Sequence, residues 1–202
     1  IDFLTGEIIP VNADFSRMGL TLCLTDTGGS HAGLDTSYAR IPADMRYIAS
    51  FFGKELLGEV DPAEFYAKKW NTSDRPVRRA KHFFDENARV PKMRDALIAG
   101  DAAEYMRLMN ESGRSSETLL TNIVTSATDD RKLETGLYLS SKLLDGIGAW
   151  RVHGGGFAGT VQAYVPLDML DAFKAEMQSV FGEKSCYVLS VRSAGGTKVT
   201  IE

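Results

Sequence analysis

The chain has 202 residues, of which 44% are hydrophobic and 25% are charged. This balance excludes a disordered chain and predicts one domain, or one domain plus a piece of another, with a core of ordinary size. The 23 Lys and Arg residues are scattered among 27 Asp and Glu residues, for a formal net charge of −4. The chain therefore lacks the excess of positive charge that binds a phosphate backbone, and we expect no nucleic-acid binding.

The sequence also lacks the features of membrane and secreted proteins. No run approaches the roughly 18 to 20 apolar residues that cross a bilayer, and the first ten residues show no basic stretch followed by an apolar one. Cys23 and Cys186 each lie in a short apolar run with no C-x-x-C pair and no His nearby, which is typical of reduced, buried thiols. We therefore expect a cytoplasmic protein that does not bind membranes.

The first part of the chain predicts an antiparallel ribbon of short strands, which has little to bury against on its own. The strands are expected at residues 1–4, 8–11 and 20–24. A polar loop rich in Gly, Asp and Thr follows at 25–38, and then a helix at 39–53. Pro42 is expected to start or kink this helix, and Gly53 to end it.

The middle third predicts a layer of helices. They are expected at 61–70, from 74 to a kink or break at Pro91, at 101–110, at 115–120 and at 130–144. Asp61, Asp74 and Asp101 are the expected caps. Gly113 is expected to break the chain between the third and fourth of these helices.

The carboxyl third returns to strands. Alternating residues predict a strand at 160–165, closed by Pro166. A helix follows at 167–182, and strands are expected at 185–191 and 197–201. The order helix, strand, glycine loop, strand, helix, strand, strand predicts an α+β sandwich of the ferredoxin-like kind.

The segment RVHGGGFAGTVQAYVP contains G-x-G-x-x-G at Gly154, Gly156 and Gly159. A dinucleotide loop needs a helix to begin at the third glycine, and here a strand begins instead. A P-loop fails as well, since no Lys followed by Ser or Thr ends the segment. The residues leave two alternatives: a plain strand connection whose glycines allow positive φ, or an anion-binding loop fixed by Phe157 packing beneath it. Positive φ is expected at Gly155 in the anion-binding loop.

Four stretches of the chain resemble the GHMP sugar kinases, and the galactokinase group in particular. GGGFAGTVQAYVP resembles the third motif of that family, usually G-G-G-F-G-G followed by a strand. Three other stretches resemble galactokinase segments in the same order: LTDTGGSHAGLDTSY at 24–38, RRAKHFFDENARV at 78–90 and MNESGRSS at 109–116. The chain departs from the family pattern at Ala158, Gly113 and Ser116, and where Ile41 and Pro42 replace a basic pair. These departures indicate a divergent branch.

The resemblance implies an α+β fold, the ferredoxin-like carboxyl-terminal domain of a GHMP kinase with extra helices. In this interpretation residues 1–35 are remnant strands of the amino-terminal domain and residues 36–202 form the carboxyl-terminal domain. The family's ATP loop, P-x-G-x-G-L-S-S-S-A, and its M-D-Q segment with the catalytic Asp do not occur in this sequence. We therefore expect that an amino-terminal domain precedes Ile1 and is the partner of this chain, and that Asp2 is a strand residue without a catalytic role.

The resemblance also assigns site residues. Tyr38 matches the sugar-contacting Tyr, whose phenol can donate and accept hydrogen bonds; the alternative is a helix-entry Tyr that packs on the ribbon. The loop that closes over the reacting phosphate matches Gly154, Gly155, Gly156, Phe157, Ala158 and Gly159. Backbone amides there suit the charge that develops during phosphoryl transfer. ATP and Mg²⁺ are implied as cofactors, held mainly by the missing part, and this chain contributes no catalytic or metal-ligating residue.

Other polar residues have structural interpretations. The three histidines are too separated for a metal site and are expected to be hydrogen-bonded structural residues: His31, His82 and His153, the last beside the loop. A solvated or ion-paired helix face is expected for Arg78, Arg79 and Lys81. A capping role near Gly113 is expected for Glu111 and Ser112.

The leading hypothesis is that the chain is the carboxyl-terminal part of a galactokinase-like enzyme. With its missing half it would transfer the γ-phosphate of Mg-ATP to the C1 hydroxyl of galactose, and alone it would be inactive. Three alternatives stay open: a kinase for another sugar, a non-catalytic relative that binds sugar and ATP to contact a protein partner, and an independent ferredoxin-like interaction module.

Overall fold

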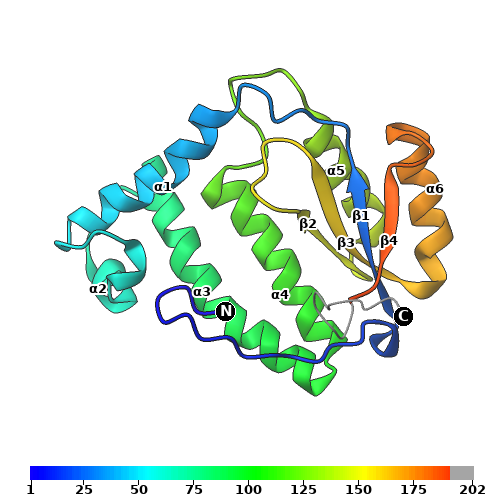
Figure 1. Ribbon diagram of the computed structural model, residues 1–202, viewed down its shortest axis with the longest axis horizontal. Helices are drawn as coiled ribbons and strands as arrows, with labels where there is room; N and C mark the ends of the chain where they lie inside the picture. The colour runs from blue at the N-terminus through cyan, green and yellow to red at the C-terminus, as the bar shows by residue number, and fades with distance from the viewer. Residues whose placement is uncertain (192–202) are drawn as a thin grey trace, which may run out of the picture.

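A computed structural model of the chain describes residues 1–191 (Figure 1). The helices of this part are α1 (Asp35–Ser50), α2 (Pro62–Ala67), α3 (Arg75–Ala99), α4 (Ala102–Ser115), α5 (Lys132–Leu144) and α6 (Leu170–Phe181). The strands are β1 (Leu20–Asp26), β2 (Ala149–Val152), β3 (Thr160–Pro166) and β4 (Cys186–Leu189). The strand expected at 197–201 lies outside the described residues.

The four strands form one antiparallel sheet in the order β2-β3-β1-β4. In its centre Cys23 of β1 lies opposite Ala163 of β3, and on the other side Thr25 of β1 lies opposite Cys186 of β4. With α5 and α6 on the connections, this order is that of the ferredoxin-like β-α-β-β-α-β unit. The expected α+β fold class is confirmed.

The expected ribbon at the start of the chain is wrong. Residues 1–15 contain no strand, and several apolar side chains there are exposed, with Phe3 at 92% and Ile1 at 72%. Only the third expected strand forms, as β1, and it lies inside the sheet, paired with β3 on one side and with β4 on the other. A domain boundary between residues 35 and 36 would therefore separate β1 from the strands to which it is hydrogen-bonded.

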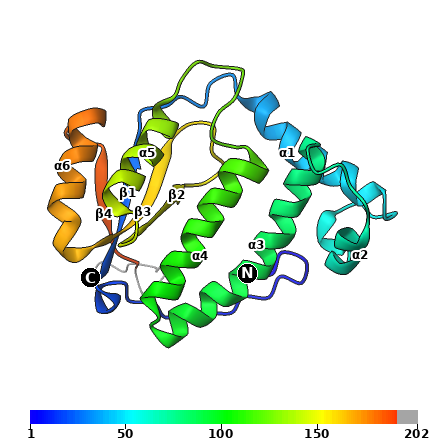
Figure 2. The same cartoon turned by 180° about the vertical axis from the view of Figure 1, so that it is seen from behind.

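Helices cover both faces of the sheet (Figures 1 and 2). On one face α5 and α6 pack over the strands, and the buried side chains of this layer are Cys23, Leu144, Ala163, Val165, Phe173, Met177 and Cys186. On the other face α4 crosses β2 and β3, with Leu20, Tyr105, Met109, Ala149 and Tyr164 buried between them. Both cysteines are free thiols and buried, as the sequence predicts.

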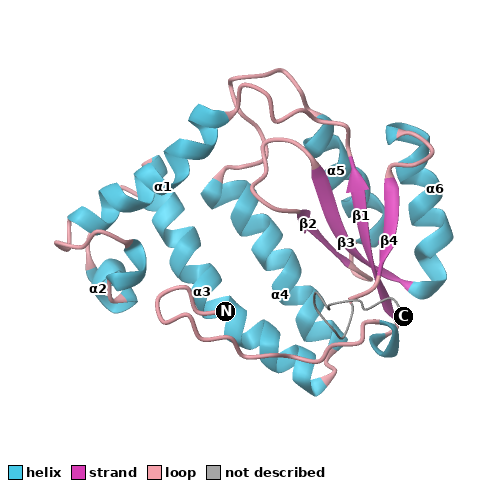
Figure 3. Ribbon diagram, viewed as in Figure 1, coloured by secondary structure: helices cyan, strands magenta, loops and turns pink. Residues whose placement is uncertain are grey.

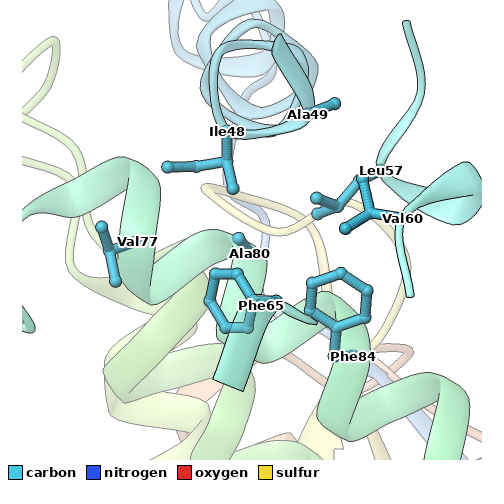
Figure 4. Close-up of a cluster of buried hydrophobic side chains, with 8 residues drawn as sticks. All are labelled: Ile48, Ala49, Leu57, Val60, Phe65, Val77, Ala80 and Phe84. Carbon is cyan, nitrogen blue, oxygen red and sulfur yellow. The ribbon is translucent and has the colours of Figure 1, made fainter. Parts of the chain in front are cut away.

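A second core joins α1, α2 and α3 away from the sheet (Figures 3 and 4). Its buried residues are Ile48, Ala49, Leu57, Val60, Phe65, Val77, Ala80 and Phe84. Asp61 caps α2 by accepting a hydrogen bond from the Ala63 amide, with Pro62 in the first turn, as expected. Among the described residues no helix combines the length and apolar character that a membrane span requires.

Two prolines lie inside helices instead of ending them. Pro42 lies within α1, which begins earlier than expected, and Pro91 lies within α3. Proline at 91 cannot donate to the carbonyl of Asn87, but Asn87 is exposed, so water can satisfy that carbonyl. The helix does not break at Pro91, which contradicts the second of the two expected outcomes, a kink or a break.

Gly113 does not interrupt the helix, contrary to expectation. α4 runs through it to Ser115, and a π-helical turn, Ser116–Leu120, follows without interruption. A Cβ at Gly113 would lie 2.8 Å from the carbonyl oxygen of Trp150 in β2. The glycine is therefore needed for the close approach of α4 to the sheet, and not for a stop signal.

Candidate functional site

The glycine loop joins β2 to β3 at one end of the sheet. Its backbone is left-handed at Gly154, Gly156 and Gly159, with φ of 72°, 81° and 92°. The non-glycine residue Phe157 is also left-handed, with φ of 61°, a conformation that costs energy and persists only where surrounding contacts enforce it. The third glycine leads directly into β3, so the loop does not have the strand-to-helix geometry of a dinucleotide fingerprint.

Phe157 packs beneath the loop. Its side chain is buried against Leu34 and Ala158, with Tyr38 and Ile41 at the edge of the cluster. The rings of Phe157 and Tyr38 meet edge to face, with their centroids 5.3 Å apart. The aromatic residue between the glycines thus anchors the loop to the start of α1.

Tyr38 lies in the first turn of α1 and contacts the loop directly. Its hydroxyl donates to the Gly156 carbonyl at 2.6 Å and lies 2.7 Å from His31 Nδ1. A phenol has one proton, and Tyr38 donates it in the hydrogen bond to the Gly156 carbonyl. His31 Nδ1 must therefore be the donor in its hydrogen bond with the Tyr38 oxygen. One lone pair of the Tyr38 oxygen remains for a hydroxyl of a ligand. Burial raises the pKa of Tyr38, so the phenol stays protonated at neutral pH.

Asn122 is a third contact of the loop, and it was not among the site residues expected from the sequence. Its backbone carbonyl accepts a hydrogen bond from the Phe157 amide at 2.5 Å, and its side-chain Nδ2 donates to the Gly155 carbonyl at 3.2 Å. The preceding Thr121 is left-handed, with φ of 57°. No local signal marks Asn122 because its partners are distant in the sequence, so only the fold shows the contact.

The individual glycines have different requirements. A Cβ at Gly156 would lie 2.1 Å from the Asn122 carbonyl oxygen, so both the space and the φ demand glycine there. The expectation of positive φ at Gly155 is wrong, since its φ is not in the left-handed region. Gly155 is instead restricted by Tyr38, whose Cε1 would lie 3.0 Å from a Cβ.

The end of the loop is tied to the segment after β1. Thr27 donates to the Gly159 carbonyl through its amide at 3.0 Å and through its hydroxyl at 2.6 Å. Ala158, where the resembling family usually has glycine, is buried with its methyl group against Gly29. Lys132, at the start of α5, donates to the Gly28 carbonyl at 3.1 Å, which places a cation beside this segment. In Figure 1 the glycine loop, the segment between β1 and α1 and the segment before α5 lie at the same end of the molecule.

A buried ion pair supports the turn that carries Asn122. Arg79 is 4% exposed and donates to Asp44 at 2.8 Å and to the Leu120 carbonyl at 3.1 Å. Burial alone would raise the pKa of Asp44, but the hydrogen bonds and charges of Arg75 and Arg79 outweigh it and lower that pKa. Arg79 is thus ion-paired, as one alternative predicted, but it is internal and not part of a solvated face.

Glu111 and Ser112 do not cap a helix, because α4 continues past them. Ser112 is fully buried and donates to Glu86 Oε2 at 2.7 Å, and the Arg151 guanidinium donates to Ser112. Glu111 is paired with Arg107 on the outside of α4. These residues join α3, α4 and β2 by polar contacts on the face of the sheet that α4 covers.

His82 is a buried structural histidine, as expected, and it predicts a pH dependence. Its Nδ1 lies 2.8 Å from the Ser115 hydroxyl, and its pKa is lowered to about 4, first by burial and then by Arg151 and Arg89. Between the unfolded value near 6.5 and about 4, the unfolded chain binds a proton that the folded chain does not. The free energy of unfolding should therefore fall by up to about 3 kcal/mol as pH drops through this range.

Urea unfolding at several pH values measures this effect. His82→Asn keeps a polar atom near Ser115 but cannot titrate, so its free energy of unfolding should change less between pH 6.5 and 4. An equal pH dependence in the variant would contradict the assignment to His82.

His153 does not contribute its side chain to the loop contacts, and the described residues offer no cluster for a metal ion. His153 is exposed, and its Nδ1 lies 3.0 Å from Gln162 Oε1, so its side chain is not among the contacts of the glycine loop. Within residues 1–191, no three His, Cys, Asp or Glu side chains gather closely enough to hold a metal ion.

Comparisons with known proteins place this architecture. No protein-family model matches the chain. The structure of Lactococcus lactis galactokinase complexed with galactose superposes with a TM-score of 0.69 and 24% identity, over 90% of this chain and 47% of that one. The structure of L. major mevalonate kinase in complex with R-mevalonate gives a TM-score of 0.54 and 17% identity, over 84% of this chain and 41% of that one.

The chain has the fold of the matching part of these two kinases. It spans less than half the length of either solved structure. Identities of this size establish the architecture, a small antiparallel sheet with helices on both faces, and they leave the assignment of substrate and activity to the site itself.

Proposed function

We propose that this chain is the carboxyl-terminal part of a galactokinase-like sugar kinase. In the intact protein it would help to transfer the γ-phosphate of ATP to the C1 hydroxyl of galactose. The observation that carries the proposal is the contact between Tyr38 and the glycine loop. These are the two features that the family resemblance assigned to sugar and phosphate, and the Tyr38 hydroxyl donates to Gly156 across 118 positions of sequence.

The backbone of the loop fits a phosphate group. The carbonyls of Gly155 and Gly156 accept hydrogen bonds from Asn122 and Tyr38. The amides of Gly154, Gly155 and Gly156 donate to no residue within the described part of the chain. Free backbone amides in such a glycine-rich turn are the donors that hold anions and stabilise charge in phosphoryl transfer. Mg-ATP supplies the transferred phosphoryl group, and we propose that other parts of the intact protein hold most of it.

The start of the chain supports the proposed amino-terminal partner domain. Its exposed apolar side chains are Ile1, Phe3, Leu4, Ile8 and Ile9. Such a run of apolar surface favours coverage by another part of the protein. The base, the metal ligands and the main nucleotide loop would lie in that part, and the 202 residues alone would be inactive.

Tyr38→Phe tests the sugar contact. The substitution keeps the ring that packs on Phe157 but removes the hydroxyl that bonds Gly156 and His31. In the intact kinase we expect KM for the sugar to rise about tenfold, because one or two neutral hydrogen bonds are lost. KM for ATP should rise less. Steady-state kinetics with each substrate varied measure the two values. Equal changes in both KM values would count against Tyr38 as a sugar contact.

The proposal as a whole is tested in two steps. The DNA upstream of the codon for Ile1 should encode, in frame, a P-x-G-x-G-L-S-S-S-A loop and an M-D-Q segment. The product of that whole reading frame should then be assayed for ADP release with galactose and with a panel of other hexoses. Turnover with a different hexose alone would change the substrate but keep the kinase, whereas an upstream frame without either segment would contradict the proposal.

A further inference from the structure

The peptide between Gly155 and Gly156 lies between two anchors. Asn122 Nδ2 donates to the carbonyl of Gly155, and the Tyr38 hydroxyl donates to the carbonyl of Gly156. In a planar trans peptide the carbonyl and the following amide point in opposite directions. Because Gly155 directs its carbonyl at Asn122, the Gly156 amide points away from Asn122, and it meets no acceptor among residues 1–191.

Asn122 is unusual in its burial. It is 2% exposed, and its Oδ1 has no hydrogen-bond partner among the described residues. A buried acceptor without a partner is costly, and an apolar side chain of the same shape would avoid that cost. What the amide side chain provides in return is the bond from its Nδ2 to the loop.

Without this bond the peptide would have no side-chain restraint on its Gly155 carbonyl. A peptide between two glycines rotates easily, because neither residue has a Cβ to exclude the alternative conformation. A flip would turn the Gly156 amide inward and present a carbonyl oxygen in its place. A carbonyl dipole at that point repels an anion, whereas the amide binds it.

We propose that Asn122 is a positioning residue that locks the Gly155–Gly156 peptide with the Gly156 amide free to bind a phosphate oxygen. Arg79 helps to hold Asn122 in place through its hydrogen bond to the Leu120 carbonyl, two residues before Asn122. The inference rests on the proposed function in one respect: it takes the anionic ligand of the loop to be a phosphate group.

The test is a titration of the 202-residue chain, labelled with 15N-glycine, with inorganic phosphate, followed by NMR. In the unsubstituted chain the amide signal of Gly156 should shift with added phosphate. In Asn122→Ala the midpoint of the shift should rise at least about fivefold, because the amide-outward conformation is no longer enforced. Asn122→Leu keeps the side-chain volume and carries the same test if the truncated variant does not fold.

Asn110→Ala is the matched control. Asn110 also bridges backbone groups, with Nδ2 on the Gly148 carbonyl and Oδ1 on the Trp150 amide, but it does not touch the loop. Its substitution should lower the melting temperature and leave the phosphate midpoint unchanged. If the midpoint is the same in Asn122→Ala as in the unsubstituted chain, the lock is wrong while the phosphate loop stands. If the Gly156 signal never responds to phosphate, the lock falls together with the phosphate-binding part of the proposed function.

Discussion

Gly156→Ala should destabilise the chain by about 3 kcal/mol or more, the sum of an overpacked contact and a left-handed alanine. The added Cβ would lie 2.1 Å from the Asn122 carbonyl oxygen, a backbone atom that already bonds the Phe157 amide. Neither partner can move without breaking the loop. If the intact protein is the proposed kinase, its kcat should fall at least about a hundredfold, because preorganised amide donors would be lost. Urea unfolding and steady-state kinetics measure the two effects.

Gly154→Ala is the matched control for this prediction. Gly154 is also left-handed, with φ of 72°, but a Cβ there would meet no atom within 4 Å. Its substitution should therefore cost only the strain of the left-handed alanine, about 1 kcal/mol. Equal losses of stability in the two variants would mean that Asn122 does not restrict Gly156.

Arg79→Met should lower the free energy of unfolding by about 3–5 kcal/mol, because it leaves the Asp44 carboxylate buried without its internal partner. The two groups are 4% and 8% exposed, and their ion pair joins α3 to α1. Arg79 also holds the Leu120 carbonyl, so the variant should loosen the turn that carries Asn122. Equilibrium unfolding in urea measures the loss.

Arg75→Met is the control for this pair. Arg75 bonds the same carboxylate at 2.7 Å, but its side chain is 46% exposed, so the salt bridge should contribute about 1 kcal/mol or less. The double variant Asp44→Leu with Arg79→Met removes both internal charges and should be more stable than the sum of the single losses predicts. A loss for Arg79→Met no larger than that for Arg75→Met would contradict the account.

The sequence predicted best those elements whose structure depends on residues close together in the chain. The alternation of Thr160 to Val165 predicts β3, and Asp61 followed by Pro62 predicts the start of α2, because these signals act within a few residues. Gly113 carries a local signal for a break, but its place against β2 outweighs that signal. The position of β1 depends on pairing with strands more than a hundred residues away, and local patterns do not encode pairing partners.

The candidate site was predictable only in part for the same reason. The resemblance selected Tyr38 and the glycine loop, and the fold brings them into contact. Asn122 has no distinctive neighbours, and its role comes from the return of the chain after α4 to the loop. The wrong expectation at Gly155 arose because a run of three glycines does not show which of them is left-handed.

The central claim, that this chain belongs to a galactokinase-like kinase, is tested most directly by ADP release with galactose and ATP. The product of the whole reading frame and the 202-residue chain should be assayed side by side. We predict galactose-dependent release of ADP by the former and none by the latter. No release with galactose or any other hexose by the whole product would contradict the kinase assignment, and robust turnover by the 202 residues alone would contradict the division of the site between two parts of the protein.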